Sequence, residues 1–137
     1  MLKNRSMPSS GVIPVLTYPD VVEASMWLCD AFGFRERLLI GTHRVQLHAG
    51  AGAVVVAGGA ASEASRASFS VMIRVADVAA HFARAKARGA TIISEPTDNP
   101  YGERQYSAQD LAGYVWTFSQ TIADVDPVSW GGVLKEG

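Results

Sequence analysis

The first part of the chain combines a short apolar stretch with a segment of helical spacing. Residues 11–18 form an apolar run with β-branched side chains, which predicts a strand. Asp20 and Glu23 then have the spacing of a capping box, and apolar positions recur at helical spacing after them. The pattern therefore predicts a helix over 21–32, with Gly33 as its C-terminal cap.

The same order of a strand, a capped helix and three further strands occurs twice. Glycine and proline breaks separate the later strands, which we predict over 34–40, 43–48, 53–57, 90–94, 103–107 and 114–121. The second unit begins with a strand over 69–75, and Asp77 starts a helix that ends near Gly89. Its capping aspartate lies 57 positions after Asp20, the cap of the first helix.

We therefore predict a single α+β domain of two βαβββ modules. The first module spans about 11–58 and the second about 68–121, with a linker over 59–67 and a tail over 122–137. Neither module alone would bury both faces of its sheet and helix, so the two must pack together. With a helix on the outer face of each sheet, the opposite faces can enclose a concave cleft, which is the expected place for a ligand.

Composition and charge narrow the class of partner. Hydrophobic residues make up 48% of the chain and charged residues 18%, which argues against disorder. The net charge of -1 and the absence of a long basic run argue against nucleic acid. The apolar stretches are much shorter than the ~20 residues that span a bilayer, so we expect no membrane contact. The single cysteine, Cys29, and the lack of a secretory apolar segment in residues 1–10 favour the cytoplasm.

The two βαβββ units and four of their segments resemble the glyoxalase/bleomycin-resistance family of the vicinal oxygen chelate superfamily. These segments are Asp20 to Phe34 with its Phe-Gly-Phe ending, Val75 to Ala90, Tyr101 to Arg104, and Asp110 to Thr117. The resemblance covers about residues 11–121 and implies paired modules with a cupped site, often in a homodimer. In the metalloenzyme members it also implies a divalent metal held by His and Glu from the first and last strand of each module.

The metal ligands implied by this resemblance are missing from the chain. Carried over by position, they fall near Ile13, Val56, Ser70 and Thr117. A divalent cation needs three or four converging lone-pair donors such as imidazole or carboxylate, and a Ser or Thr hydroxyl is a weak substitute. The segments 11–18, 69–75 and 113–121 contain no His, Asp, Glu or Cys, so a small change of register restores none. We therefore expect no metal and no other cofactor.

The expected ligand contacts lie mainly on the second module. Alternation along the strand over 69–75 directs Ser70, Met72 and Arg74 toward the cleft. Arg74 either recognises an anionic group of the ligand or forms a salt bridge to Glu103. The other predicted contacts of this module are Tyr101, Glu103, Arg104, Val115 and Thr117. Alternatively, Arg104 anchors the turn at Asp110.

The three histidines are weaker candidates for ligand or metal contacts. His48 shares a predicted strand face with Arg44 and Gln46, and this face either lines the cleft or is a solvated surface. His43 and His48 are five residues apart on one strand, so they point to opposite faces and cannot both hold one ion without a bulge. His81 is expected to be an exposed or interface residue of the second helix.

These observations together predict a metal-independent small-molecule-binding protein, similar to bleomycin-resistance proteins that sequester their ligand. The alternative is a glyoxalase-like lyase or isomerase, or a dioxygenase, that holds a divalent metal through other residues, for instance His48 with Glu103. A third interpretation is a module that pairs with another polypeptide through an apolar patch. A homodimer is expected because the first helix carries Val22, Met26 and Cys29 outside its main apolar stripe.

Overall fold

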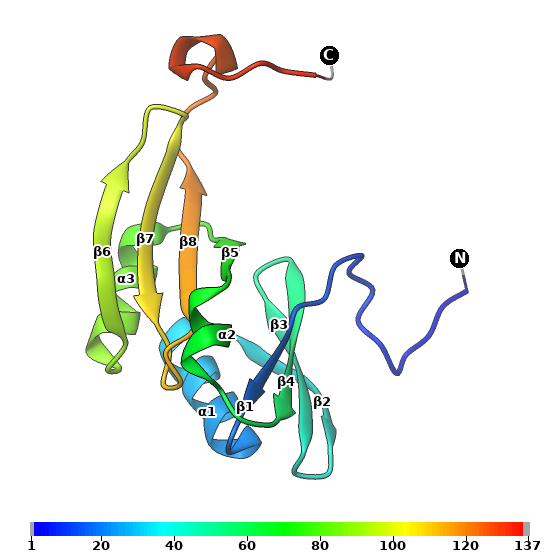
Figure 1. Cartoon of the computed structure of the whole chain (residues 1–137). Coiled ribbons are helices and arrows are strands. Elements are labelled where there is room, and N and C mark those ends of the chain that lie inside the picture. The colour runs from blue at the N-terminus through cyan, green and yellow to red at the C-terminus, as the bar shows by residue number, and fades with distance from the viewer. Residues whose placement is uncertain (1, 136–137) are drawn as a thin grey trace.

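The computed structural model describes residues 2–135, so the last two residues of the predicted tail lie outside the described residues (Figure 1). The first module contains β1 (Val15–Tyr18), α1 (Val21–Phe32), β2 (Arg35–Ile40), β3 (Arg44–Ala49) and β4 (Gly52–Gly58). The second contains β5 (Ser70–Arg74), α3 (Val78–Ala87), β6 (Thr91–Asp98), β7 (Glu103–Gln109) and β8 (Val115–Thr121). Two elements lie outside the predicted pattern: the short helix α2 (Glu63–Ala67) in the linker, and the 3-10 turn η1 (Pro127–Trp130) in the tail.

Both long helices begin at the predicted capping aspartates. Asp20 Oδ1 accepts a hydrogen bond from the Glu23 N–H at 3.0 Å, and Asp77 Oδ1 accepts one from the Ala80 N–H at 3.1 Å. Helix α1 ends at Gly33, whose φ of 73° lies in the left-handed region that favours glycine. Within residues 2–135, no helix is long and apolar enough to cross a membrane.

The strands form two four-stranded mixed sheets of identical topology. Their orders are β1-β4-β3-β2 and β5-β8-β7-β6, and the first strand of each module runs parallel to the last. This arrangement confirms the predicted α+β fold of paired βαβββ modules. Strand β6 continues past Pro96, beyond its predicted end, because its pairing with β7 is irregular between Ser94 and Thr97 and an edge strand tolerates proline there.

A single hydrophobic core joins the two modules through their helix-bearing sides. The Phe32 ring at the end of α1 packs against Phe118 of β8, with ring centroids 4.9 Å apart. From α3, Arg84 donates a hydrogen bond to the Asp30 carbonyl of α1 at 2.8 Å. We expected the helices on the outside and the polar faces of the sheets turned toward each other. Instead, the helices contact each other, and within one chain each polar face lies on the side of its sheet away from this core.

Candidate functional site

Most of the predicted ligand contacts lie together on one face of the second sheet. This face, which we call the polar face of module 2, carries Ser70, Met72, Arg74, Glu103, Gln105, Ser107, Val115, Thr117 and Ser119. The register places Met72 opposite Thr117, and Thr117 opposite Ser107, so these side chains lie side by side across β5, β8 and β7. The alternate residues of β8, Trp116 and Phe118, are buried on the other face.

A chain of hydrogen bonds runs across the polar face of module 2. Arg74 Nη2 lies 3.0 Å from Glu103 Oε1, and Ser119 Oγ donates to the same oxygen at 2.7 Å. Gln105 Nε2 donates to Ser119 Oγ at 3.0 Å, and the Tyr101 hydroxyl donates to Gln105 Oε1, also at 3.0 Å. The network therefore fixes the orientation of side chains from three separate segments.

The charges on this face neutralise each other. Hydrogen bonds from Thr121 and Ser119, together with the Arg74 guanidinium, lower the pKa of the Glu103 carboxyl, so Glu103 is ionised at neutral pH. The Arg74 side chain is 69% exposed and that of Glu103 15%, so the arginine remains within reach of a ligand. Of the two arrangements predicted for Arg74, the structure has the salt bridge to Glu103.

Arg104 and Tyr101, the two other predicted ligand contacts of the second module, lie outside the centre of the polar face. Arg104 points to the opposite face of β7 from Glu103, because neighbouring residues of a strand alternate in direction. Its Nε lies 2.6 Å from Asp98 Oδ1 of β6, so it is not the anchor of the Asp110 turn. The Tyr101 ring packs against Trp130 of the tail, with centroids 5.2 Å apart. Arg104 is therefore separated from the polar face, whereas Tyr101 stands at its end.

His48 lies in the other module, on the face of β3 that also carries Arg44 and Gln46. The alternate residues Val45 and Leu47 are buried in the core, as the alternation predicts. His48 borders a cavity of about 640 Å³ beside the N-terminal segment. Glu103, its partner in the metal site considered as an alternative, belongs to the second sheet, and within residues 2–135 neither residue is part of a group of three or more possible metal ligands.

The residues present do not fit the divalent metal that the resemblance implies for metalloenzymes. Val56 faces the core, and its neighbour Val55 takes the position that corresponds to Thr117 in the second module. Neither valine has a lone pair, and the Thr117 hydroxyl is already hydrogen-bonded to Ser107 Oγ at 2.7 Å. Within residues 2–135, no group of three or more His, Cys, Asp or Glu side chains could hold a metal ion.

A buried carboxylate, which the sequence pattern indicates only as part of a turn, connects the two modules. Asp110 Oδ2 accepts hydrogen bonds from the Tyr18 hydroxyl at 2.6 Å and from Trp116 Nε1 at 3.0 Å. Its Oδ1 accepts from the backbone N–H groups of Ala112 and Tyr114. Burial, followed by the charge of Asp110 and this hydrogen bond, raises the pKa of Tyr18 far above its ordinary value. Tyr18 therefore remains a protonated donor from module 1 to module 2.

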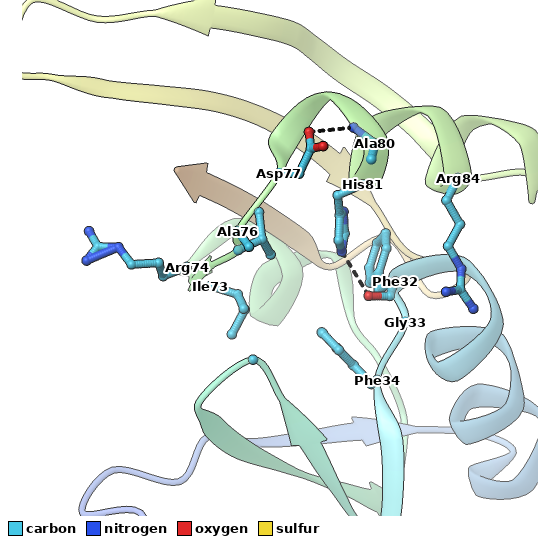
Figure 2. A pocket seen from close by; sticks show the side chains of 12 residues that line it. Phe32, Gly33, Phe34, Ile73, Arg74, Ala76, Asp77, Ala80, His81 and Arg84 are labelled. Atoms are coloured by element: carbon cyan, nitrogen blue, oxygen red, sulfur yellow. Dashed lines mark hydrogen bonds between the residues drawn. The ribbon is translucent and has the colours of Figure 1, made fainter. Parts of the chain in front are cut away.

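His81 is the second residue whose role comes from contacts distant in sequence. It lies beside a cavity of about 460 Å³ between α3 and the end of α1, and Figure 2 shows its ring directed at the Phe32 carbonyl. Its Nε2 lies 2.8 Å from that oxygen and its Nδ1 lies 2.5 Å from the Tyr106 hydroxyl. Desolvation lowers the pKa of His81, so the neutral ring donates to Phe32 and accepts from Tyr106. The Nε2 bond to Phe32 thus joins the two modules, and the Nδ1 contact with Tyr106 orients the ring within the second module.

Comparisons with known proteins agree with this architecture. The structure of TioX from Micromonospora sp. ML1 is 33% identical in sequence, covers 85% of this chain and 100% of its own, and has a TM-score of 0.69. A glyoxalase/bleomycin resistance protein/dioxygenase family enzyme from Burkholderia phytofirmans PsJN is 22% identical, covering 80% of this chain and 96% of its own, with a TM-score of 0.68.

A lactoylglutathione lyase from Agrobacterium tumefaciens is 16% identical, covering 82% of this chain and 94% of its own, with a TM-score of 0.63. At such low identities, the second and third similarities establish the fold alone. No curated protein matches the chain significantly. The model of the Glyoxalase/Bleomycin resistance protein/Dioxygenase superfamily matches residues 13–118. The chain therefore belongs to this superfamily.

Proposed function

We propose that this protein binds and sequesters a small organic molecule without a metal, and that the polar face of module 2 is its ligand surface. The observation that carries the proposal is the composition of this face. The positions that would bear metal ligands in the metalloenzymes carry the hydroxyls of Ser70 and Thr117, and the one ion pair, between Arg74 and Glu103, is internally neutralised. Such a surface recognises its ligand by hydrogen bonds and apolar contact.

The groups on this face suit an amphipathic molecule with a polar or anionic end. Met72 is 60% exposed and offers an adaptable apolar contact, while Gln105 and Ser107 offer amide and hydroxyl groups. Arg74 gives up or shares its bond to Glu103 when it receives an anionic or carbonyl oxygen of the ligand. We place this activity in the cytoplasm, as the sequence predicts.

Glyoxalase-type turnover is not part of the proposed function. In a metal-dependent reaction of this kind, the cation polarises a substrate oxygen and stabilises the negative charge that develops, a contribution of several kcal/mol. The face supplies hydroxyls and a paired arginine in place of that charge. We therefore expect binding without isomerisation.

We also propose that the ligand site is completed by a second copy of the chain. The polar face of module 2 turns away from the core and is open on one side. The outer surface of α1 adds exposed apolar area, since Val22 is 42% and Met26 65% exposed. A homodimer would bury this helix surface and enclose the polar face. Sedimentation at tens of micromolar should give the dimer mass, and a monomer at that concentration would contradict the proposal.

The test of the binding function begins with protein purified without chelators. We expect native mass spectrometry to detect an organic molecule bound to the protein, and elemental analysis to find less than stoichiometric divalent metal. Added Zn²⁺, Mn²⁺ or Ni²⁺ should not confer isomerisation of the methylglyoxal-glutathione adduct. Metal-dependent isomerisation would overturn the proposal.

A matched pair of arginine variants then locates the surface. Arg74→Ala should weaken binding of the co-purified molecule by about 1.5 to 3 kcal/mol through loss of a charge-assisted hydrogen bond. Arg104→Ala removes a second ion-paired arginine of the same module on the opposite face, so it should leave the affinity unchanged. Equal effects of the two substitutions would show that the polar face is not the binding surface.

A further inference from the structure

The open face of module 1 already holds a segment of the chain itself. Arg37 Nη2 donates hydrogen bonds to the backbone carbonyl oxygens of Arg5 at 3.0 Å and Met7 at 2.9 Å. Gln46 Nε2 donates to the Ser6 carbonyl oxygen at 2.9 Å. Three consecutive backbone carbonyls therefore receive hydrogen bonds from two side chains of this sheet.

The two donor side chains hold each other in place. Gln46 Oε1 accepts a hydrogen bond from Arg37 Nη1 at 2.5 Å, which leaves its amide nitrogen directed at the segment. Gln46 is 3% exposed. The irregular pairing of β2 with β3 between Glu36 and Leu38 surrounds Arg37, and a bulge of this kind redirects a side chain. The donors are thus preorganised for carbonyl groups.

Apolar contacts accompany the polar ones. Pro8, which follows the three carbonyls, is buried and borders the same cavity as Ala53 and His48. Val55, at the centre of this face, is 2% exposed. The segment therefore reaches the face through a turn, in which the Met7 N–H donates to the Asn4 carbonyl at 3.3 Å. Its carbonyl groups lie on the polar donors, and its buried proline lies beside small residues of this sheet.

We propose that the open face of module 1 is a binding site for a peptide-like ligand with consecutive amide carbonyls, and that residues 5–8 are an internal occupant that the ligand displaces. This site is built on the first sheet and the polar face of module 2 on the second, so its residues differ from those of the function proposed above. Its recognition is through carbonyl oxygens and a small apolar ring, which excludes a requirement for charge on the ligand.

The direct test uses a fluorescent synthetic peptide with the sequence of residues 3–10 as the probe. A chain without residues 1–8 keeps the whole hydrophobic core, whose first residue is Leu16. We expect this shortened chain to bind the peptide at least tenfold more tightly than the full chain, because the internal segment competes at high effective concentration. Equal binding by the two chains, or no binding by the shortened chain, would overturn the proposal.

Substitutions show whether the peptide uses the proposed donors. Gln46→Glu keeps an acceptor for Arg37 but removes the donor to the Ser6 carbonyl, so peptide affinity of the shortened chain should fall about tenfold. Arg44→Ala removes another arginine from the same face of β3 and should leave the affinity unchanged. A similar loss with both substitutions would contradict carbonyl recognition by Gln46.

Proteolysis tests the internal occupant in the full chain. The Arg5 carbonyl is held by Arg37, so trypsin should cut the bond after Arg5 slowly, with the bond after Lys3 as an internal reference. Gln46→Glu should accelerate the cut after Arg5 at least tenfold relative to the reference, and Arg44→Ala should not. An unchanged rate in Gln46→Glu would argue against a displaceable segment. Loss of folded structure in the shortened chain would also overturn the proposal, because residues 5–8 would then be a structural part of the module.

Discussion

The open faces of the two modules occupy the same place in the repeat but differ in character. In module 2, Thr117 lies on a face of hydroxyl, amide and paired charged groups that are bonded to each other. The corresponding residue of module 1, Val55, is almost fully buried on a face that binds residues 5–8 through Arg37 and Gln46. The core sides of both sheets are mainly apolar. The repeat therefore keeps what packs the fold, while the two outer faces differ in the chemical groups that they present.

The largest expected effect comes from placing a charge at these two corresponding positions. Val55→Asp buries a carboxylate without a partner and should lower the free energy of unfolding by about 4 kcal/mol. Thr117→Asp lies on the open polar face and should cost about 1 kcal/mol, mainly through the hydrogen bond to Ser107. Urea unfolding of both variants measures the difference. Equal losses of the free energy of unfolding would mean that the two faces are equally accessible to water.

Substitutions at the contact between the two modules should lower the free energy of unfolding nearly as much. Asp110→Asn places an amide that can donate opposite the donors Tyr18 and Trp116, and should lower the free energy of unfolding by about 3 kcal/mol. Tyr18→Phe removes only one donor and serves as the milder control, at about 1 to 2 kcal/mol. The same urea experiment applies. A smaller loss for Asp110→Asn than for Tyr18→Phe would show that this carboxylate does not join the halves.

Protonation of His81 should make the free energy of unfolding moderately dependent on pH. Its pKa in the folded state lies below the ordinary 6.5, chiefly through desolvation. As the pH falls below 6.5, the unfolded chain binds a proton that the folded chain does not, so the free energy of unfolding should decrease. The slope from one residue is at most about 1.4 kcal/mol per pH unit. His81→Gln should remove this contribution between pH 7.5 and 5.5, whereas His43→Gln on an exposed turn should keep it.

The smallest effect on stability is expected on the polar face itself. Arg74→Ala breaks a largely exposed ion pair with Glu103, so the free energy of unfolding should fall by less than about 1 kcal/mol. Thermal unfolding of the variant and the unmodified protein provides the measurement. A loss above 2 kcal/mol would assign Arg74 a structural role and weaken its proposed part in ligand binding.

Local patterns were sufficient to predict much of this architecture. The capping aspartates Asp20 and Asp77 and the alternation of apolar residues define the repeat, because caps and strand alternation depend on neighbours in sequence. The same alternation identified Ser70, Met72 and Arg74 as neighbours on one face. That these residues contact a ligand remains a prediction.

The wrong predictions concern the direction of side chains on a strand and the contacts between segments distant in sequence. Grouping Arg104 with Glu103 by closeness in sequence overlooked that neighbours on a strand point to opposite faces. A shift of one residue likewise assigned Val56 in place of Val55 to the open face. The role of His81 depends on Phe32, 49 positions earlier, and no local pattern indicates that contact. Packing of the two helix-bearing sides decides these contacts, and a sequence pattern does not specify it.

The bond from Arg84 to the end of α1 has a consequence for the order in which the protein folds during synthesis. Helix α1 has no basic residue in its last turn, and its Asp30 carbonyl accepts a hydrogen bond from a side chain 54 positions later in the chain. The ribosome therefore releases α1 well before the residue that completes its C-terminal end. Until then, the C-terminal end of α1 remains exposed to water. The final packing of the first module has to follow the synthesis of α3.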